Sequence, residues 1–172
     1  MTTLRSKAKE VLRLGSLFLI LSGLCSLFAW AIRWRAFLQM IPGGPLMTCD
    51  TAICFVLVGC GFWAATRGAA QAMRVIGVLL VVLGAIYLEA GLNHAWVTLH
   101  FFFPDLTAAM VAPLPAETCR VSVATAATIL QLGILFFLMA KESLQRLGLN
   151  AAAFLASSIM ATGVFGAVCR LA

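Results

Sequence analysis

Charged residues are scarce in this sequence, and their scarcity argues against a soluble fold. Only 10% of the 172 residues are charged and 63% are hydrophobic, whereas soluble domains are about 25% charged and roughly 45–50% apolar. A small soluble domain leaves much of its surface in water, where so many apolar side chains would be exposed. The mean hydropathy of +1.05 therefore predicts an integral membrane protein, for which lipid is the solvent.

The sequence also lacks the residue patterns of common catalytic and metal sites. It contains no nucleophile triad, phosphate-binding loop or paired carboxylates, and its cysteines form no C-x-x-C pair. We therefore expect neither an enzyme nor a metal centre. Cys49 and Cys119 lie at membrane edges, and a disulfide between them stays open. The other cysteines lie in apolar runs, where a thiol behaves as a small hydrophobe: Cys25, Cys54, Cys60 and Cys169.

Apolar runs of membrane-spanning length are abundant. A transmembrane helix needs about 20 mostly apolar residues, and its backbone amides must be bonded internally. Five such runs follow a basic segment, 1–13, and they cover residues 14–32, 51–66, 75–92, 121–140 and 147–169. The sequence predicts an all-α integral membrane protein, with about five transmembrane helices in a single polytopic domain, 1–172.

The basic residues predict the orientation of these helices, because cytoplasmic loops carry an excess of Lys and Arg. One side would hold Arg5, Lys7, Lys9, Arg13, Arg67, Arg74, Lys141 and Arg146, and the other Arg33, Arg35, Arg120 and Arg170. We expect a bacterial inner-membrane protein with a cytoplasmic N-terminus and a periplasmic C-terminus. The net charge of +6 then reflects topology and anionic lipid headgroups rather than nucleic acid. Trp30 and Trp34 suit an interfacial belt.

An internal repeat relates the second apolar run to the fourth. Residues 47–59 align with 121–133 at a constant offset, and Thr51/Thr125, Ala52/Ala126 and Gly59/Gly133 are identical pairs. The repeat predicts helix-loop-helix units at about 14–66 and 75–140, with a partial third unit at 147–172.

Two physical requirements explain the repeated residues. A helix that enters the bilayer needs a cap for its first amides, and the hydroxyls of Thr48 and Ser122 are expected to be these N-caps. Ala52 and Gly59 are seven residues apart and share a helix face, where small residues let helices approach. Gly133 occupies the same position in the second copy.

The repeated pattern resembles the multi-pass N-terminal membrane region of bacterial sensor histidine kinases and diguanylate cyclases, over residues 14–166. The first copy comprises Pro42-Gly43, Met47, Thr51-Ala52, Phe55, Leu57 and Gly59, the second Arg120-Val-Ser, Thr125-Ala126 and Gly133, and the join between them Tyr87-Leu-Glu-Ala-Gly-Leu92 with Phe101-Phe-Phe-Pro-Asp105. The second copy has no Pro-Gly and carries Gln131 at a usually apolar position. No PAS, kinase or cyclase sequence follows, so we expect either a truncated sensor region or a stand-alone relative.

A few polar residues are candidates for ligand or partner contact. Glu89 is the only acid well inside an apolar run, and such residues are functional candidates because charge in the bilayer is costly. It would pair with Asn93, His94 or Gln131, or lie at the interface beside the first two. The only histidines, His94 and His100, fall on different faces of a helix, so ordinary interfacial histidines are favoured over a metal or haem site.

Small residues on the fifth run predict contact between helices, within the chain or against a partner: Ser157, Ala161 and Gly166. Such faces favour association with other membrane proteins or self-association. We expect a sensor or scaffold module that relays a bilayer or periplasmic signal to an attached or partner protein. The alternative is a small accessory subunit of a respiratory or photosynthetic membrane complex. No cofactor is required by the sequence, and quinone, pigment and haem stay open as ligands.

Overall fold

The computed structural model describes residues 2–38, 47–92 and 122–140, and each element in these ranges is a helix. Three long segments are apolar enough to cross a membrane: Lys9–Ala31, Cys49–Arg67 and Ala70–Leu92. The prediction of a helical membrane protein is confirmed to this extent. The fifth run, 147–169, lies outside the described residues. The helices are α1 (Thr2–Ala31), α2 (Arg35–Leu38), α3 (Cys49–Arg67), α4 (Ala70–Leu92) and α6 (Val123–Met139).

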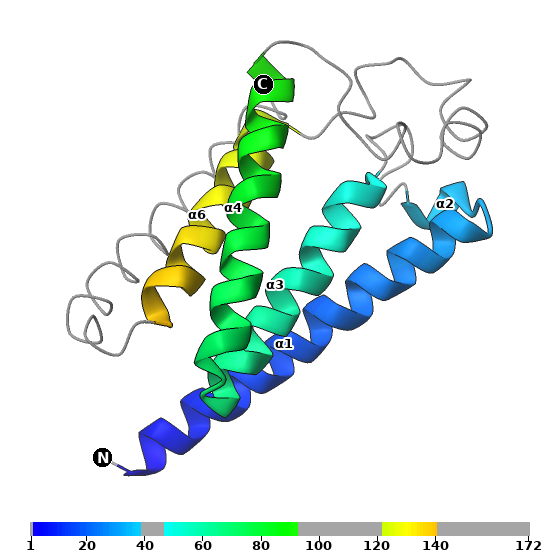
Figure 1. Cartoon of the computed structure of the whole chain (residues 1–172). Coiled ribbons are helices and arrows are strands. Elements are labelled where there is room, and N and C mark those ends of the chain that lie inside the picture. Colours follow the sequence, from blue (N-terminus) through cyan, green and yellow to red (C-terminus); the bar gives the residue numbers. More distant parts are fainter. Residues whose placement is uncertain (1, 39–46, 93–121, 141–172) are drawn as a thin grey trace, which may run out of the picture.

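The long helices form two hairpins, α1 with α3 and α4 with α6 (Figure 1). A tight turn at Gly68 joins α3 of the first hairpin to α4 of the second. Gly68 has φ +69°, and its N–H donates to the carbonyl oxygens of the last turn of α3. A left-handed residue after a helix is usually glycine because it has no Cβ to clash. The contact between α3 and α4 is much smaller than the contact within either hairpin.

Glycines bring the two helices of each hairpin into backbone contact. A Cβ built on Gly59 of α3 would lie 2.8 Å from the carbonyl oxygen of Ser16 in α1. A Cβ on Gly133 of α6 would lie 2.8 Å from the carbonyl oxygen of Gly77 in α4. Because Gly59 and Gly133 are repeat partners, the two hairpins close through the same contact.

A second contact, two turns further along, is also shared by the hairpins. A Cβ on Gly23 of α1 would lie 3.0 Å from the backbone nitrogen of Val56, and one on Gly84 of α4 would lie 2.6 Å from that of Leu130. In the repeat, Ser16 corresponds to Gly77 and Gly23 to Gly84, at an offset of 61 residues. Corresponding residues of α3 and α6 are 74 residues apart. The repeat therefore includes α1 and α4, and the second unit has the longer connection between its helices.

The buried core lies along α3, α4 and α6. The ring of Phe136 is fully buried and meets Phe62 in a T-shaped pair, with 5.1 Å between ring centroids. Leu80 is fully buried on α4 beside this pair. The other buried core residues are Cys54, Val58, Ala64, Met73, Tyr87, Ala126, Ile129 and Ala140.

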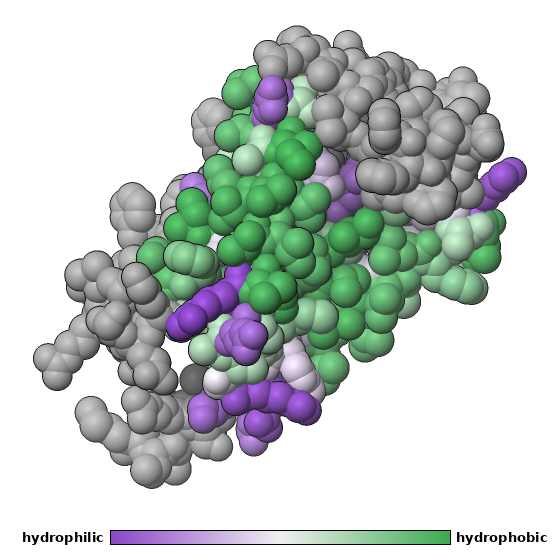
Figure 2. Space-filling model, viewed as in Figure 1, coloured by the Kyte–Doolittle hydropathy of each residue, from purple (hydrophilic) through white to green (hydrophobic). Residues whose placement is uncertain are grey.

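Large apolar side chains remain exposed on the outside of the bundle. Phe18 is 71% exposed on α1, and Val75 and Phe137 are also exposed. Figure 2 shows a hydrophobic band across the middle of the molecule, with hydrophilic residues gathered at the end where α1 begins. An apolar surface of this kind is unfavourable in water and indicates contact with the lipid bilayer.

Candidate functional site: a buried polar pair between the hairpins

The starts of α3 and α6 have the same cap geometry. Thr48 and Ser122 are the N-caps, with extended backbones at φ/ψ of −71/151° and −68/148°. The Thr51 N–H donates to the Thr48 hydroxyl at 3.3 Å, and the Thr125 N–H donates to the Ser122 hydroxyl at 3.1 Å. In both copies the two side-chain oxygens are also 2.8 Å apart. The structure thus places both caps where the sequence predicts them.

The predicted packing residues lie at the seams of the hairpins, that is, at the contacts of α1 with α3 and of α4 with α6. Ala52 has no exposed surface, and Gly59 and Gly133 are also buried. The carbonyl oxygen of Ala52 lies 2.7 Å from a Cβ built on Gly23, so Ala52 and Gly59 face α1 together. Small residues on one face therefore set how closely these helices approach. The predicted packing residues of the fifth run, Ser157, Ala161 and Gly166, lie outside the described residues.

One polar pair crosses from the first hairpin to the second. Asp50, in the first turn of α3, is 3% exposed, and Tyr87, on α4, is 6% exposed. The Tyr87 hydroxyl donates a hydrogen bond to Asp50 Oδ1 at 3.2 Å. A buried carboxylate is costly unless it is hydrogen-bonded, and the N-terminal end of a helix also favours negative charge. The pair is therefore stabilised where α3 and α4 come together.

The repeat does not reproduce this pair. The position that matches Asp50 in α6 is Ala124, and the position that matches Tyr87 in α1 is Ser26. The Ser26 hydroxyl donates to the Ser22 carbonyl oxygen at 2.9 Å, within its own helix. The Asp50–Tyr87 hydrogen bond is thus a property of the contact between hairpins.

The sequence pointed to neither member of this pair, although two signals were available. Asp50 is an acid in the first turn of an apolar helix, and Tyr87 is the only tyrosine in the chain. Both lie near the same end of the bundle, since α3 begins where α4 ends. Their contact also depends on the rotation of both helices about their axes, which the sequence does not specify.

Glu89, the acid that the sequence singled out, is exposed on α4. Among the described residues no hydrogen bond or ion pair of Glu89 is present, so Gln131, one of the partners suggested by the sequence, does not pair with it here. Gln131 is half-buried on α6. The remaining suggested partners, Asn93, His94 and His100, lie outside the described residues.

Trp30, which the sequence suggests for an interfacial belt, is packed against the protein at the end of α1. It is 5% exposed, and its indole N–H donates to the Met47 carbonyl oxygen at 2.8 Å. This bond joins the end of α1 to the residue before the α3 cap, so burial satisfies the polar tip of the ring. Trp34, by contrast, is 53% exposed.

The described residues offer no metal centre. No three His, Cys, Asp or Glu side chains among them are grouped closely enough to hold an ion. Cys25, Cys49, Cys54 and Cys60 are free thiols. Cys119, suggested as a partner for Cys49, lies outside the described residues.

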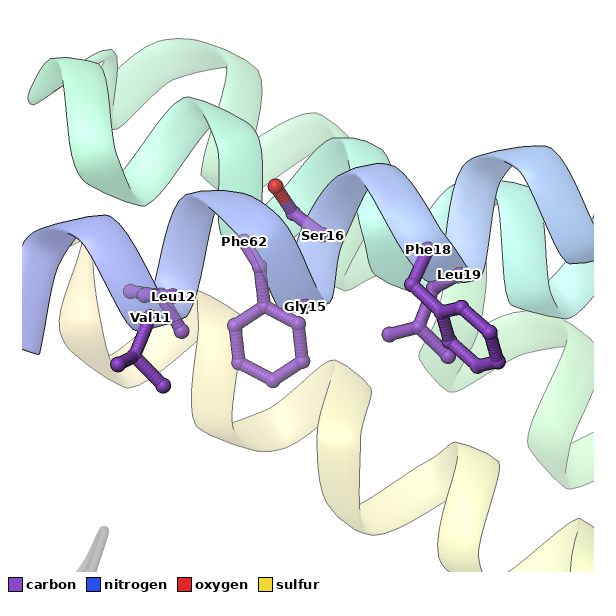
Figure 3. A pocket seen from close by; sticks show the side chains of 7 residues that line it. All are labelled: Val11, Leu12, Gly15, Ser16, Phe18, Leu19 and Phe62. Atoms are coloured by element: carbon purple, nitrogen blue, oxygen red, sulfur yellow. The ribbon is translucent and has the colours of Figure 1, made fainter.

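An apolar groove of about 600 Å³ runs along α1 and is floored by Phe62 of α3. Figure 3 shows the Phe62 ring lying between the side chains of Val11 and Phe18. Leu12, Gly15, Ser16 and Leu19 complete the lining.

No family model, curated protein or solved structure matches this chain.

Proposed function

We propose that this chain is a membrane-embedded sensor or scaffold module that relays a bilayer or periplasmic signal to an attached or partner protein. The observation that carries the proposal is the Asp50–Tyr87 hydrogen bond, which links two tightly closed hairpins across a smaller contact. The resemblance to the membrane regions of sensor kinases and cyclases agrees with this function. So does the predicted orientation in a bacterial inner membrane, with the N-terminus in the cytoplasm.

The close seams make each hairpin a rigid body. At Gly59 and Gly133 the space for a Cβ is already filled by backbone atoms of the facing helix. Helices in such contact cannot slide past one another without separating, because packed interfaces have discrete rather than continuous arrangements. A force on one helix is therefore passed to its hairpin partner.

The contact between α3 and α4 that contains the Asp50–Tyr87 hydrogen bond, here called the joint between the hairpins, has the properties of a switch. Breaking the Tyr87–Asp50 bond removes one donor from a buried carboxylate, so the contact between the hairpins favours discrete bonded and rearranged states. The energy of a polar contact between membrane helices is about 0.6 kcal/mol on average and reaches about 1.7 kcal/mol. A signal of similar energy is enough to shift such an equilibrium several-fold.

The proposal is tested by measuring distances between and within the hairpins in lipid nanodiscs. Spin labels are placed through unnatural amino acids, because the chain contains six cysteines. One pair joins the exposed positions Leu21 of α1 and Phe137 of α6, and the other joins Leu21 to Phe55 of α3. Tyr87→Phe is expected to broaden or shift the first distance distribution and leave the second unchanged.

Thr128→Val is the matched control for this experiment, because the Thr128 hydroxyl bonds the Ala124 carbonyl oxygen within α6 alone. It should leave both distributions unchanged. Identical distributions in Tyr87→Phe and the parent protein would contradict the switch. Copurification from native membranes then tests the relay, since Asp50→Asn should alter recovery of a partner. A partner retained in full at fixed stoichiometry would favour an accessory subunit.

A further inference from the structure

The groove on α1 is chemically uniform. Its lining side chains are aliphatic or aromatic, apart from Gly15 and Ser16. Ser16 is buried, and its hydroxyl donates to the Arg13 carbonyl oxygen at 2.7 Å, which uses its proton within the helix. The groove therefore presents hydrocarbon to its occupant and offers no hydrogen bond that would orient a polar ring.

The dimensions of the groove suit a hydrocarbon chain. Its lining extends from Val11 to Leu19 on α1, which is about 12 Å of helix at ~1.5 Å per residue. One leaflet of a bilayer contributes about half of a ~30 Å hydrocarbon core. The groove thus matches most of the depth of a single leaflet.

Positive charge lies at one end of the groove. Lys9 precedes Leu12 by three residues and Ser16 by seven, so it continues the groove-lining face of α1 toward the N-terminus. Lys9 and Arg13 are both exposed, as is Glu10 between them, so the net charge of the three is positive. Basic residues of this kind attract anionic lipid headgroups, and their long aliphatic stems can follow the apolar surface while their charges stay at its edge.

We propose that the groove is a binding site for an anionic phospholipid, with one acyl chain along α1 and Phe62 and the headgroup at Lys9 and Arg13. The charge next to the groove selects an anionic lipid over a zwitterionic one. The site is independent of the proposed relay, since lipid binding requires no partner and no signal.

Gly15 allows the groove to be filled without disturbing the protein. A Cβ built on Gly15 meets no atom within 4 Å, so Gly15→Phe places its ring in the space of the acyl chain. Leu21→Phe is the matched control, because Leu21 is 58% exposed on α1 and is not part of the groove. Lys9→Gln removes charge from an exposed position and keeps the groove intact.

The experiment is native mass spectrometry of the purified full chain after equilibration with equal amounts of dioleoylphosphatidylglycerol and dioleoylphosphatidylcholine. The parent protein and Leu21→Phe should retain one phosphatidylglycerol preferentially. Gly15→Phe should weaken its retention at least about tenfold, as expected when roughly two methylene groups are excluded from the groove. Lys9→Gln should lower the preference for phosphatidylglycerol about fivefold, the factor for one basic residue beside an anionic headgroup.

With a folded Gly15→Phe variant, any of three results would overturn the proposal. The first is equal lipid retention in Gly15→Phe and Leu21→Phe. The second is a parent protein purified with an isoprenoid quinone in place of phospholipid, with that quinone lost in Gly15→Phe. The third is a change from dimer to monomer in Gly15→Phe with lipid retention unaltered, which would assign the groove to a second copy of the chain. If Gly15→Phe does not fold, an unchanged lipid preference in Lys9→Gln overturns the proposal by itself.

Discussion

The seams within the hairpins and the joint between them are built on different principles. The seams are repeated, apolar and close, with glycines at Gly59 and Gly133 pressed against the facing backbone. The contact between the hairpins is smaller, and among the described residues it combines an aromatic contact between α3 and α6, Phe62 with Phe136, with the Asp50–Tyr87 hydrogen bond between α3 and α4. Small residues thus build close, repeated units, whereas the Asp50–Tyr87 hydrogen bond distinguishes the contact between these units.

The largest expected effect comes from filling a seam. Gly59→Leu and Gly133→Leu should each lower the free energy of unfolding by about 3 kcal/mol or more, since overpacking against backbone leaves little room for relief. Titration with SDS in mixed micelles measures this loss. Gly15→Ala, on the open side of α1, should stay within about 0.5 kcal/mol of the parent. A tolerated Gly59→Leu with a damaging Gly133→Leu would show that the two seams are not equivalent.

The repeated caps should have equal and smaller effects. Thr48→Ala and Ser122→Ala each remove the acceptor for an amide in the first turn, at a cost of about 1 kcal/mol. The double variant should lose the sum of the two, because the caps belong to different helices. The same SDS titration decides the matter, and Thr48→Ser is the conservative control. A loss in only one of the two single variants would argue against equivalent caps.

The polar joint is expected to contribute less than a cap. In a double-mutant cycle, Asp50→Ala and Tyr87→Phe should show a coupling energy of about 0.6 kcal/mol, with ~1.7 kcal/mol as the upper range for contacts between membrane helices. The control pair is Asp50→Ala with Thr128→Val, whose side chains do not bond, and it should be additive. Additive effects of Asp50→Ala and Tyr87→Phe would show that the hydrogen bond between these side chains does not stabilise the contact between the hairpins.

The smallest effect is expected at Glu89, which belongs to neither the seams nor the joint. Because Glu89 is exposed and has no hydrogen bond among the described residues, Glu89→Gln should change the free energy of unfolding by less than about 0.5 kcal/mol. Glu89→Leu should be tolerated. If Glu89→Gln abolished recovery of a partner while unfolding stayed unchanged, Glu89 would become a contact residue for that partner.

Local rules made much of the fold predictable from the sequence. Long apolar runs indicate helices in lipid because the bilayer leaves backbone amides no other partner. The N-cap roles of the Thr48 and Ser122 hydroxyls are predictable because each residue directly precedes an apolar run. The small residues Ala52 and Gly59 show a shared face through their spacing alone. The correspondence of α1 with α4 is harder to recognise in the sequence. The close contact requires only a small residue at this position, which is Ser16 in α1 and Gly77 in α4.

What the sequence by itself determined, in the part of the chain that the structure describes, is the long apolar helices, the caps of α3 and α6 and their small-residue faces, since each follows from neighbours a few residues away. Tertiary structure alone decided the polar contacts. Tyr87 meets Asp50 only because two helices present matching faces at the same depth. Trp30 is packed against the protein, where the Met47 carbonyl accepts its N–H. Among the described residues Glu89 has no such acceptor or donor beside it, because its side chain is exposed on α4. These outcomes depend on the rotation and depth of packed helices, which hydropathy and spacing do not record.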